Sequence, residues 1–110
     1  FGKQRPVGDK VLKMLMTRYP DIKSAADVTP AVGVANAYDA MHLVALAIKS
    51  AGSTDGPKIR EGFYKIGTYD GLIKVYNAPF APGRHDAITE TDYVWTHFVD
   101  NQILPVGMKK

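Results

Sequence analysis

The sequence has 110 residues and no cysteine, so it offers neither a disulfide framework nor a thiolate nucleophile or metal ligand. It also lacks a strong excess of charge of one sign, because 14 Lys and Arg stand against 11 Asp and Glu, for a net charge of +3. The basic residues are scattered, and only Lys109 and Lys110 are adjacent. No nucleic-acid-binding surface is therefore predicted.

Long apolar runs are missing as well. The longest candidate, residues 43–48, is far shorter than the roughly 18 apolar residues that typically span a bilayer. No charged segment followed by an apolar stretch marks a signal peptide. With 45% hydrophobic and 23% charged residues, the composition is typical of one small soluble domain. Because the sequence opens at Phe1 without a methionine, we expect a processed or truncated product.

What the sequence does contain is three helical patterns. The first begins near Asp9 and ends at Pro20, and one side of it carries Val11, Leu12, Leu15, Met16 and Tyr19. The second begins at residues 33–35 and runs to about Ser50. It is apolar nearly all round, which predicts burial on more than one side. Gly52 is expected to cap its carboxyl end.

The third helical pattern follows capping and proline signals in residues 53–57, and Gly67 is expected to end it. One apolar stripe on this helix consists of Ile59, Phe63 and Ile66. Between the first two helices, residues 21–30 are expected to form a loop with a short turn.

Strand signals dominate the last third of the sequence. We expect a strand over residues 72–76, a proline- and glycine-containing crossing segment over 79–91, and a closing hairpin. The hairpin would pair the aromatic residues 93–99 with residues 103–106 through a turn at Asp100 and Asn101. Three helices followed by a strand, a crossing and a hairpin predict an α/β or α+β class.

Several phrases of the sequence, taken in order, resemble one protein family. They are Ala-Tyr-Asp-Ala at 37–40, Ala-Gly-Ser-Thr-Asp at 51–55, Gly-Phe-Tyr-Lys-Ile at 62–66, Tyr-Asp-Gly-Leu-Ile-Lys-Val-Tyr at 69–76, Asn-Ala-Pro-Phe at 77–80, Arg-His-Asp-Ala-Ile at 84–88, Asp-Tyr-Val-Trp at 92–95 and Gln-Ile-Leu-Pro-Val at 102–106. Over roughly residues 30–107, the sequence is similar to the C-terminal part of type I periplasmic solute-binding proteins of ABC importers, in the branch for branched-chain amino acids and other hydrophobic solutes.

The resemblance implies an α/β fragment of the periplasmic-binding-protein type I fold, in which two lobes joined by three crossing strands close on a ligand. Residues 1–80 would be the C-terminal part of lobe one, 81–91 the final crossing segment, and 92–110 the terminal strands of lobe two. The implied protein is a non-catalytic, extracytoplasmic component without a cofactor. It would capture a small amino acid or a hydrophobic or aromatic organic acid and deliver it to a membrane permease.

The entry to the long helix is the expected ligand contact. In the family, residues just before the Tyr-Asp-Ala phrase line the cleft, which points to Gly33, Val34 and Asn36 here. A helix amino end offers free N–H groups for a carboxylate, Gly33 permits close backbone approach, and Asn36 supplies both donor and acceptor. Ordinary packing of Gly33 and Val34 against a sheet is the competing interpretation.

A small enzyme or interaction domain is the alternative function, with Asp39, His42 and His85 as its polar residues. Asp39 and His42 are three apart on a helix, but a metal site needs a third ligand, so structural hydrogen bonds are the favoured interpretation and no metal is predicted. The enzyme interpretation requires the three groups to meet in one pocket. The binding interpretation requires Asn36 at an open cleft edge and the 84–86 cluster near a crossing, where Arg84 and Asp86 would anchor a hinge.

The apolar helix and the apolar strand at 72–76 also predict self-association. Both present apolar surface that needs a packing partner, and an unpaired apolar strand tends to pair with a strand of another chain. We therefore expect the chain by itself to be a homo-oligomer that pairs or exchanges its C-terminal strands.

Overall fold

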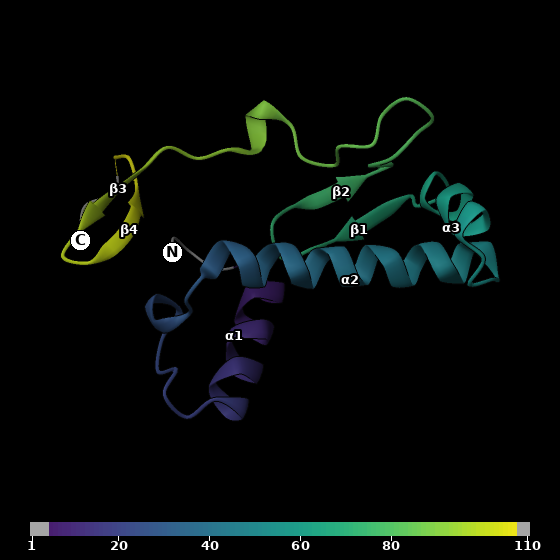
Figure 1. Ribbon diagram of the computed structural model, residues 1–110. Coiled ribbons are helices and arrows are strands. Elements are labelled where there is room, and N and C mark those ends of the chain that lie inside the picture. Colours follow the sequence, from purple (N-terminus) through teal and green to yellow (C-terminus); the bar gives the residue numbers. More distant parts are fainter. Residues whose placement is uncertain (1–4, 108–110) are drawn as a thin grey trace.

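The computed structural model describes residues 5–107 and has a mixed α/β architecture with two small antiparallel sheets (Figure 1). Phe1, Lys109 and Lys110 lie outside the described residues. The elements, in order, are α1 (Pro6–Arg18), η1 (Ala25–Asp27), α2 (Ala31–Ala51), α3 (Gly56–Phe63), β1 (Thr68–Asp70), β2 (Val75–Asn77), η2 (Glu90–Asp92), β3 (Thr96–Val99) and β4 (Gln102–Pro105).

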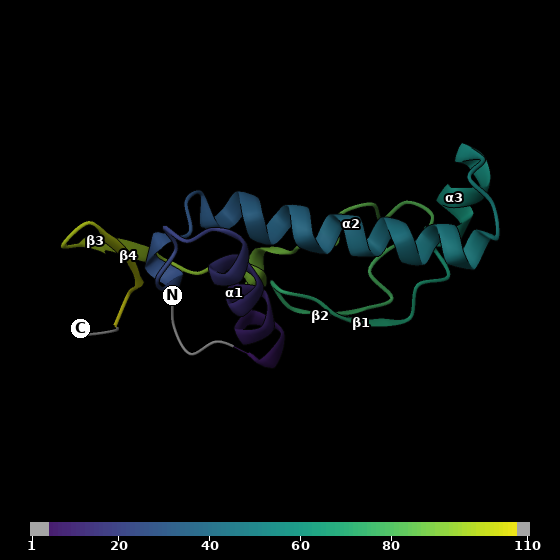
Figure 2. The same cartoon turned by 90° about the horizontal axis from the view of Figure 1, so that it is seen from below.

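Helix α2 is the central element of the fold. The β1–β2 hairpin lies along one side of it, α3 packs at its carboxyl end, and α1 lies near its amino end (Figures 1 and 2). Gly52 caps α2 in the left-handed conformation with φ 59°, and its N–H donates to the Ile48 carbonyl, as the sequence predicted. The Asp55 side chain caps α3 by accepting from the Lys58 N–H.

The core is small and lies on one face of α2. Leu43 and Ala47 of this face pack against Ile66 and Tyr76, and the predicted stripe of α3 closes the cluster through Ile59 and Phe63. Helices α2 and α3 approach each other at Gly62, where an added Cβ would lie 2.2 Å from the Ala47 carbonyl oxygen. Only glycine permits this approach.

The prediction that α2 is buried on more than one side is wrong for this chain. Its buried residues are Asp39, Leu43 and Ala47, which share one face, while Met41 is 68% and Val32 73% exposed. The apolar composition of α2 is therefore not matched by packing partners among the described residues. Likewise, Met16 of α1 and Tyr19, which directly follows this helix, are exposed, although both belong to the predicted apolar pattern.

Helix α2 is also long and apolar enough to cross a membrane, judged by length and composition only. The sequence expectation counted uninterrupted apolar residues and therefore overlooked a helix whose average stays apolar across Asp39 and His42. The same composition is found in core helices of soluble proteins. The buried contacts of Asp39 tie this helix to the β1–β2 hairpin.

The strand predicted at residues 72–76 is confirmed only at Val75 and Tyr76, because β2 spans Val75–Asn77. It is one arm of a hairpin whose other arm, β1, carries little apolar signal. Strand β1 pairs with β2 in the register Thr68↔Asn77, Tyr69↔Tyr76 and Asp70↔Val75. Leu72 and Ile73 lie in the turn between the strands, because their N–H groups donate to the Asp39 carboxylate instead of a ladder.

The C-terminal hairpin is confirmed, although β3 begins at Thr96, so residues 93–95 of the predicted strand lie before it. Strands β3 and β4 pair from Thr96↔Pro105 to Val99↔Gln102, and Asp100 and Asn101 form the turn with positive φ angles of 47° and 62°. Residues 79–91 are irregular, as predicted, apart from an isolated bridge between Ala81 and Arg84 and the start of η2. The radius of gyration is 16.2 Å, against about 13 Å for a compact domain of this length, so the described chain is extended.

Candidate functional site

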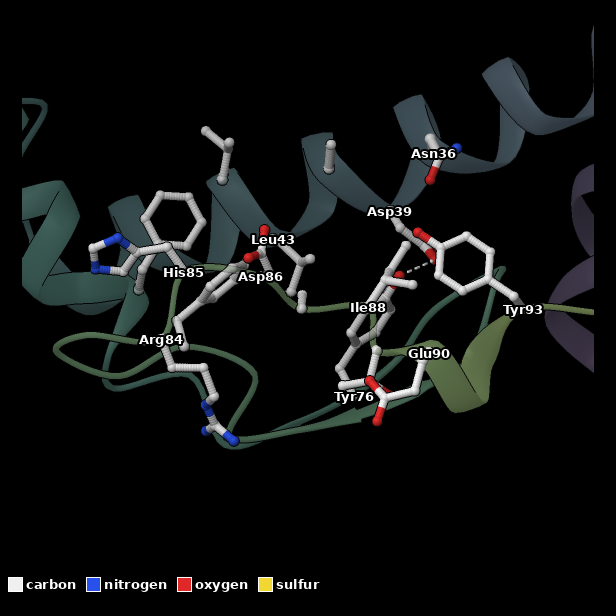
Figure 3. A pocket seen from close by; sticks show the side chains of 16 residues that line it. Asn36, Asp39, Leu43, Tyr76, Arg84, His85, Asp86, Ile88, Glu90 and Tyr93 are labelled. Atoms are coloured by element: carbon white, nitrogen blue, oxygen red, sulfur yellow. Dashed lines mark hydrogen bonds between the residues drawn. The ribbon is translucent and has the colours of Figure 1, made fainter.

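An open groove of about 850 Å³ lies between α2 and the segment that follows β2. We call it the α2 groove. Its walls combine apolar and polar side chains (Figure 3). The lining residues are Asn36, Asp39, Ala40, Leu43, Val44, Phe63, Tyr76, Phe80, Arg84, His85, Asp86, Ala87, Ile88, Thr89, Glu90 and Tyr93.

One wall of the groove is α2 itself. Asn36, Leu43 and the buried Asp39 lie along the same side of the helix because they are separated by three and four residues. Asn36 is exposed and stands toward the amino end of this wall, so its amide can reach solvent or a ligand. Leu43 and Val44 make the middle of the wall apolar.

The opposite wall comes from residues 84–93. Figure 3 shows the His85 ring at one end of the groove, with Glu90 and Tyr93 toward the other end. The Tyr64 hydroxyl lies 3.1 Å from His85 Nε2, which ties this wall to the carboxyl end of α3. The Arg84 guanidinium donates to the Ala78 carbonyl at 2.5 Å, so this cation ties the crossing segment to the end of β2.

Asp39 is the centre of a buried hydrogen-bond network at the base of the groove. It is 2% exposed. Its carboxylate accepts from the N–H groups of Leu72 and Ile73 at 2.5 and 2.8 Å and from the hydroxyl of Tyr76 at 2.9 Å; the Tyr69 hydroxyl lies at 3.5 Å. These donors satisfy the carboxylate where water is excluded, and they hold the β1–β2 turn against α2.

The network affects its two tyrosines. Burial, followed by the nearby Asp39 charge, raises the pKa of Tyr69 to about 12. Burial and the hydrogen bond to Asp39 raise the pKa of Tyr76 further still. Both phenols therefore stay protonated as donors across the physiological range. Their rings continue a row with Tyr38 and His42, in which successive ring centroids are 4.2, 5.9 and 5.9 Å apart.

The three residues predicted to contact ligand are placed differently. Asn36 lines the α2 groove. Val34 lines a separate cavity of about 160 Å³ between α1 and α2, together with Val11 and Leu72. Gly33 is exposed, and an added Cβ would meet the Pro30 ring at 3.2 Å. The structure therefore brings only Asn36 of this set to the α2 groove.

The polar residues of the alternative function do not all meet. Asp39 and His85 both line the α2 groove, whereas His42 does not, and His42 Nδ1 lies 2.8 Å from the Tyr38 carbonyl oxygen. Within residues 5–107, no group of three or more His, Asp or Glu side chains is placed to hold a metal ion.

Sequence reasoning missed an ion pair between the β1–β2 turn and the end of the crossing segment. The Lys74 ammonium lies 2.5 Å from the Asp92 carboxylate, and both side chains are largely shielded from solvent. The hydrogen bond from Lys74, with a further one from the Thr89 N–H, lowers the pKa of Asp92. The pair fixes the end of the crossing segment to the β1–β2 hairpin. The Thr-x-x-Asp capping box at residues 89–92 could have predicted the short helical turn η2 that positions Asp92.

Comparison of the chain with protein-family models, curated proteins and solved structures found no match.

Proposed function

We propose that this chain is the C-terminal part of a two-lobed, extracytoplasmic solute-binding protein of an ABC importer. In this proposal the α2 groove is one wall of the ligand cleft. The protein is non-catalytic, and it captures a small amino acid or a hydrophobic or aromatic organic acid for a membrane permease. The sequence phrases between residues 30 and 107 motivate the proposal.

The observation that carries the proposal is the position of Asn36 in the α2 groove. Its exposed amide stands on a wall whose middle is apolar, with Leu43 and Val44 beside Phe80. Small-molecule sites are typically concave and mostly apolar, with a few polar groups that orient the ligand. An apolar wall with one free amide and a short polar stretch at residues 84–86 suits a solute with an apolar body and a charged head.

The extended shape of the chain supports a fragment with one cleft wall. The α2 groove is open, and two apolar side chains of α2 outside the core face, Val32 and Met41, are exposed. A two-lobed capture protein provides the second wall from its other lobe and closes by a hinge. The Lys74–Asp92 pair sits where residues 81–91 end, which is where the proposed final crossing would be anchored.

The experiment uses the product of the complete gene that encodes this chain. Calorimetry against a panel of branched-chain, aromatic and other hydrophobic acids should find one tightly bound class. Asn36→Ala should weaken that binding, while Lys49→Ala, an exposed change on the same helix, should not. Equal affinity in the Asn36→Ala variant would remove the α2 groove from the ligand site, and no binding by the parent would refute the proposed function.

A further inference from the structure

The β3–β4 hairpin stands apart from the rest of the molecule. Figures 1 and 2 both place it beyond the amino end of α2, away from the β1–β2 hairpin. Trp95 is 87% and Phe98 80% exposed, and they belong to opposite faces because side chains alternate along a strand. A lone two-stranded hairpin is marginally stable in water. This hairpin therefore has two uncovered apolar faces and little support of its own.

The register determines which backbone groups of β3 are free. The Val106 N–H donates to the Trp95 carbonyl, and Val99 stands opposite Gln102 at the two-residue turn. Hydrogen-bonded and non-hydrogen-bonded pairs alternate in an antiparallel ladder. The backbone groups of Trp95, His97 and Val99 therefore face β4, and those of Thr96 and Phe98 face outward.

The two outer edges of the hairpin are not equivalent. On β4 the outward residues are Ile103 and Pro105, and proline has no N–H to donate. On β3 the outward residues Thr96 and Phe98 each offer an N–H and a C=O. Strand β3 contains no lysine, arginine, acid or proline, which are the residues that natural proteins use to block an edge strand.

We propose that β3 pairs antiparallel with β3 of a second copy of this chain, across a two-fold axis at His97. Thr96 then forms a hydrogen-bonded pair with Phe98 of the second copy, and the reverse pair forms on the other side of the axis. The two hairpins become one four-stranded antiparallel sheet. This inference concerns the chain by itself, and its test does not depend on ligand binding.

A second copy suits this edge for two reasons. Identical strands can always pair antiparallel about a two-fold axis, and no fixed like charges on β3 oppose that pairing. Exposed aromatic side chains beside this edge would add to the contact. Tyr93, Trp95 and Phe98 are mostly exposed, and aromatic side chains carry about 150–250 Å² each, so they offer roughly 500 Å². That is more than half of the ~800 Å² per partner in a standard interface.

The absence of cysteine makes a sharp test available. In the His97→Cys variant the two new cysteines would face each other in a non-hydrogen-bonded pair, with Cα atoms about 4.5 Å apart. That distance lies within the range that disulfides span. In Gln102→Cys, the matched control on β4, the two cysteines would be three strand spacings apart across the sheet and four residues apart along the strands, on the order of 20 Å in all. Both positions are exposed, so the substitutions leave the core intact.

The proposal predicts three results. Light scattering of the unmodified chain should show a dimer that dissociates on dilution. Mild oxidation should cross-link His97→Cys at least tenfold faster than Gln102→Cys. Phe98→Lys should be monomeric, while Val32→Lys, an exposed change on α2, should still dimerise. A monomer at every concentration would overturn the proposal, and so would a dimer in which the two cysteine variants cross-link equally or in which Phe98→Lys has no effect.

Discussion

We expect the substitution of Asp39 by alanine to destabilise the chain more than any other single substitution in helix α2. The carboxylate accepts from the Leu72 and Ile73 N–H groups and from the Tyr76 hydroxyl, all within 2.9 Å. A hydrogen bond to a charged group contributes about 1.5–3 kcal/mol, and each buried donor left unpaired costs about 1–3 kcal/mol. Partial entry of water reduces the sum. We expect a loss of about 3–5 kcal/mol in the free energy of unfolding, a large share of the roughly 5–15 kcal/mol typical of a domain.

Two milder substitutions in the same network should cause smaller losses in the free energy of unfolding. Asp39→Asn keeps the shape and one acceptor oxygen but turns an NH₂ donor toward backbone donors, so we expect a loss of about 2 kcal/mol. Tyr76→Phe removes a single hydroxyl bond and should cost about 1 kcal/mol. Because both groups belong to one network, the Asp39→Asn, Tyr76→Phe double variant should lose less than the two single losses combined.

Urea unfolding followed by circular dichroism measures these losses. Lys49→Ala is the control, since Lys49 is exposed on the same helix, and it should stay within about 0.5 kcal/mol of the parent. If Asp39→Ala unfolded at the same urea concentration and with the same slope as the parent, the network would not be holding the β1–β2 turn to α2.

Three other results are expected. Gly62→Ala should destabilise the chain by more than about 2 kcal/mol because its Cβ would meet the Ala47 carbonyl, while Gly67→Ala, where nothing lies within 4 Å, should be nearly neutral in the same urea experiment. The depressed pKa of Asp92 means that its pair with Lys74 adds stability above the ordinary pKa of 3.8, and that this stability is lost as pH falls below it. The difference in melting temperature between the parent and Asp92→Asn should therefore be present at neutral pH and vanish in acid; a difference that is constant with pH would contradict this assignment. Alkaline titration followed by tyrosinate absorbance should show Tyr69 and Tyr76 ionising only well above the usual value of 10, and Asp39→Asn should lower both, whereas unchanged titration would exclude the carboxylate as a cause.

Local signals in the sequence were sufficient for the elements that depend on neighbouring residues. The helix ends at Gly52 and Asp55 and the turn at Asp100 and Asn101 were predicted because each needs only a cap or a left-handed backbone. Strand β1 was missed because its three residues gain their strand conformation from pairing with β2, not from their own composition.

Burial and the groove could not be predicted in the same way, because they depend on distant segments. The composition of α2 predicts partners on several sides, yet the described chain supplies them on one. Asn36 and Val34 are two residues apart, and this rotation sends them to different cavities. The structural interpretation of Asp39 was right, although its partners at residues 69–76 could not be identified from helical spacing.

The most direct test of the ligand-cleft proposal is an amide NMR titration of the isotope-labelled chain with the same panel of hydrophobic acids. With one wall of the cleft, we expect weak binding, saturating on the order of millimolar solute. The shifts should concentrate at Asn36, Leu43 and residues 84–90 of the α2 groove, and they should fall in Asn36→Ala but not in Lys49→Ala. Shifts centred on α1, or identical shifts in Asn36→Ala and the parent, would contradict the account.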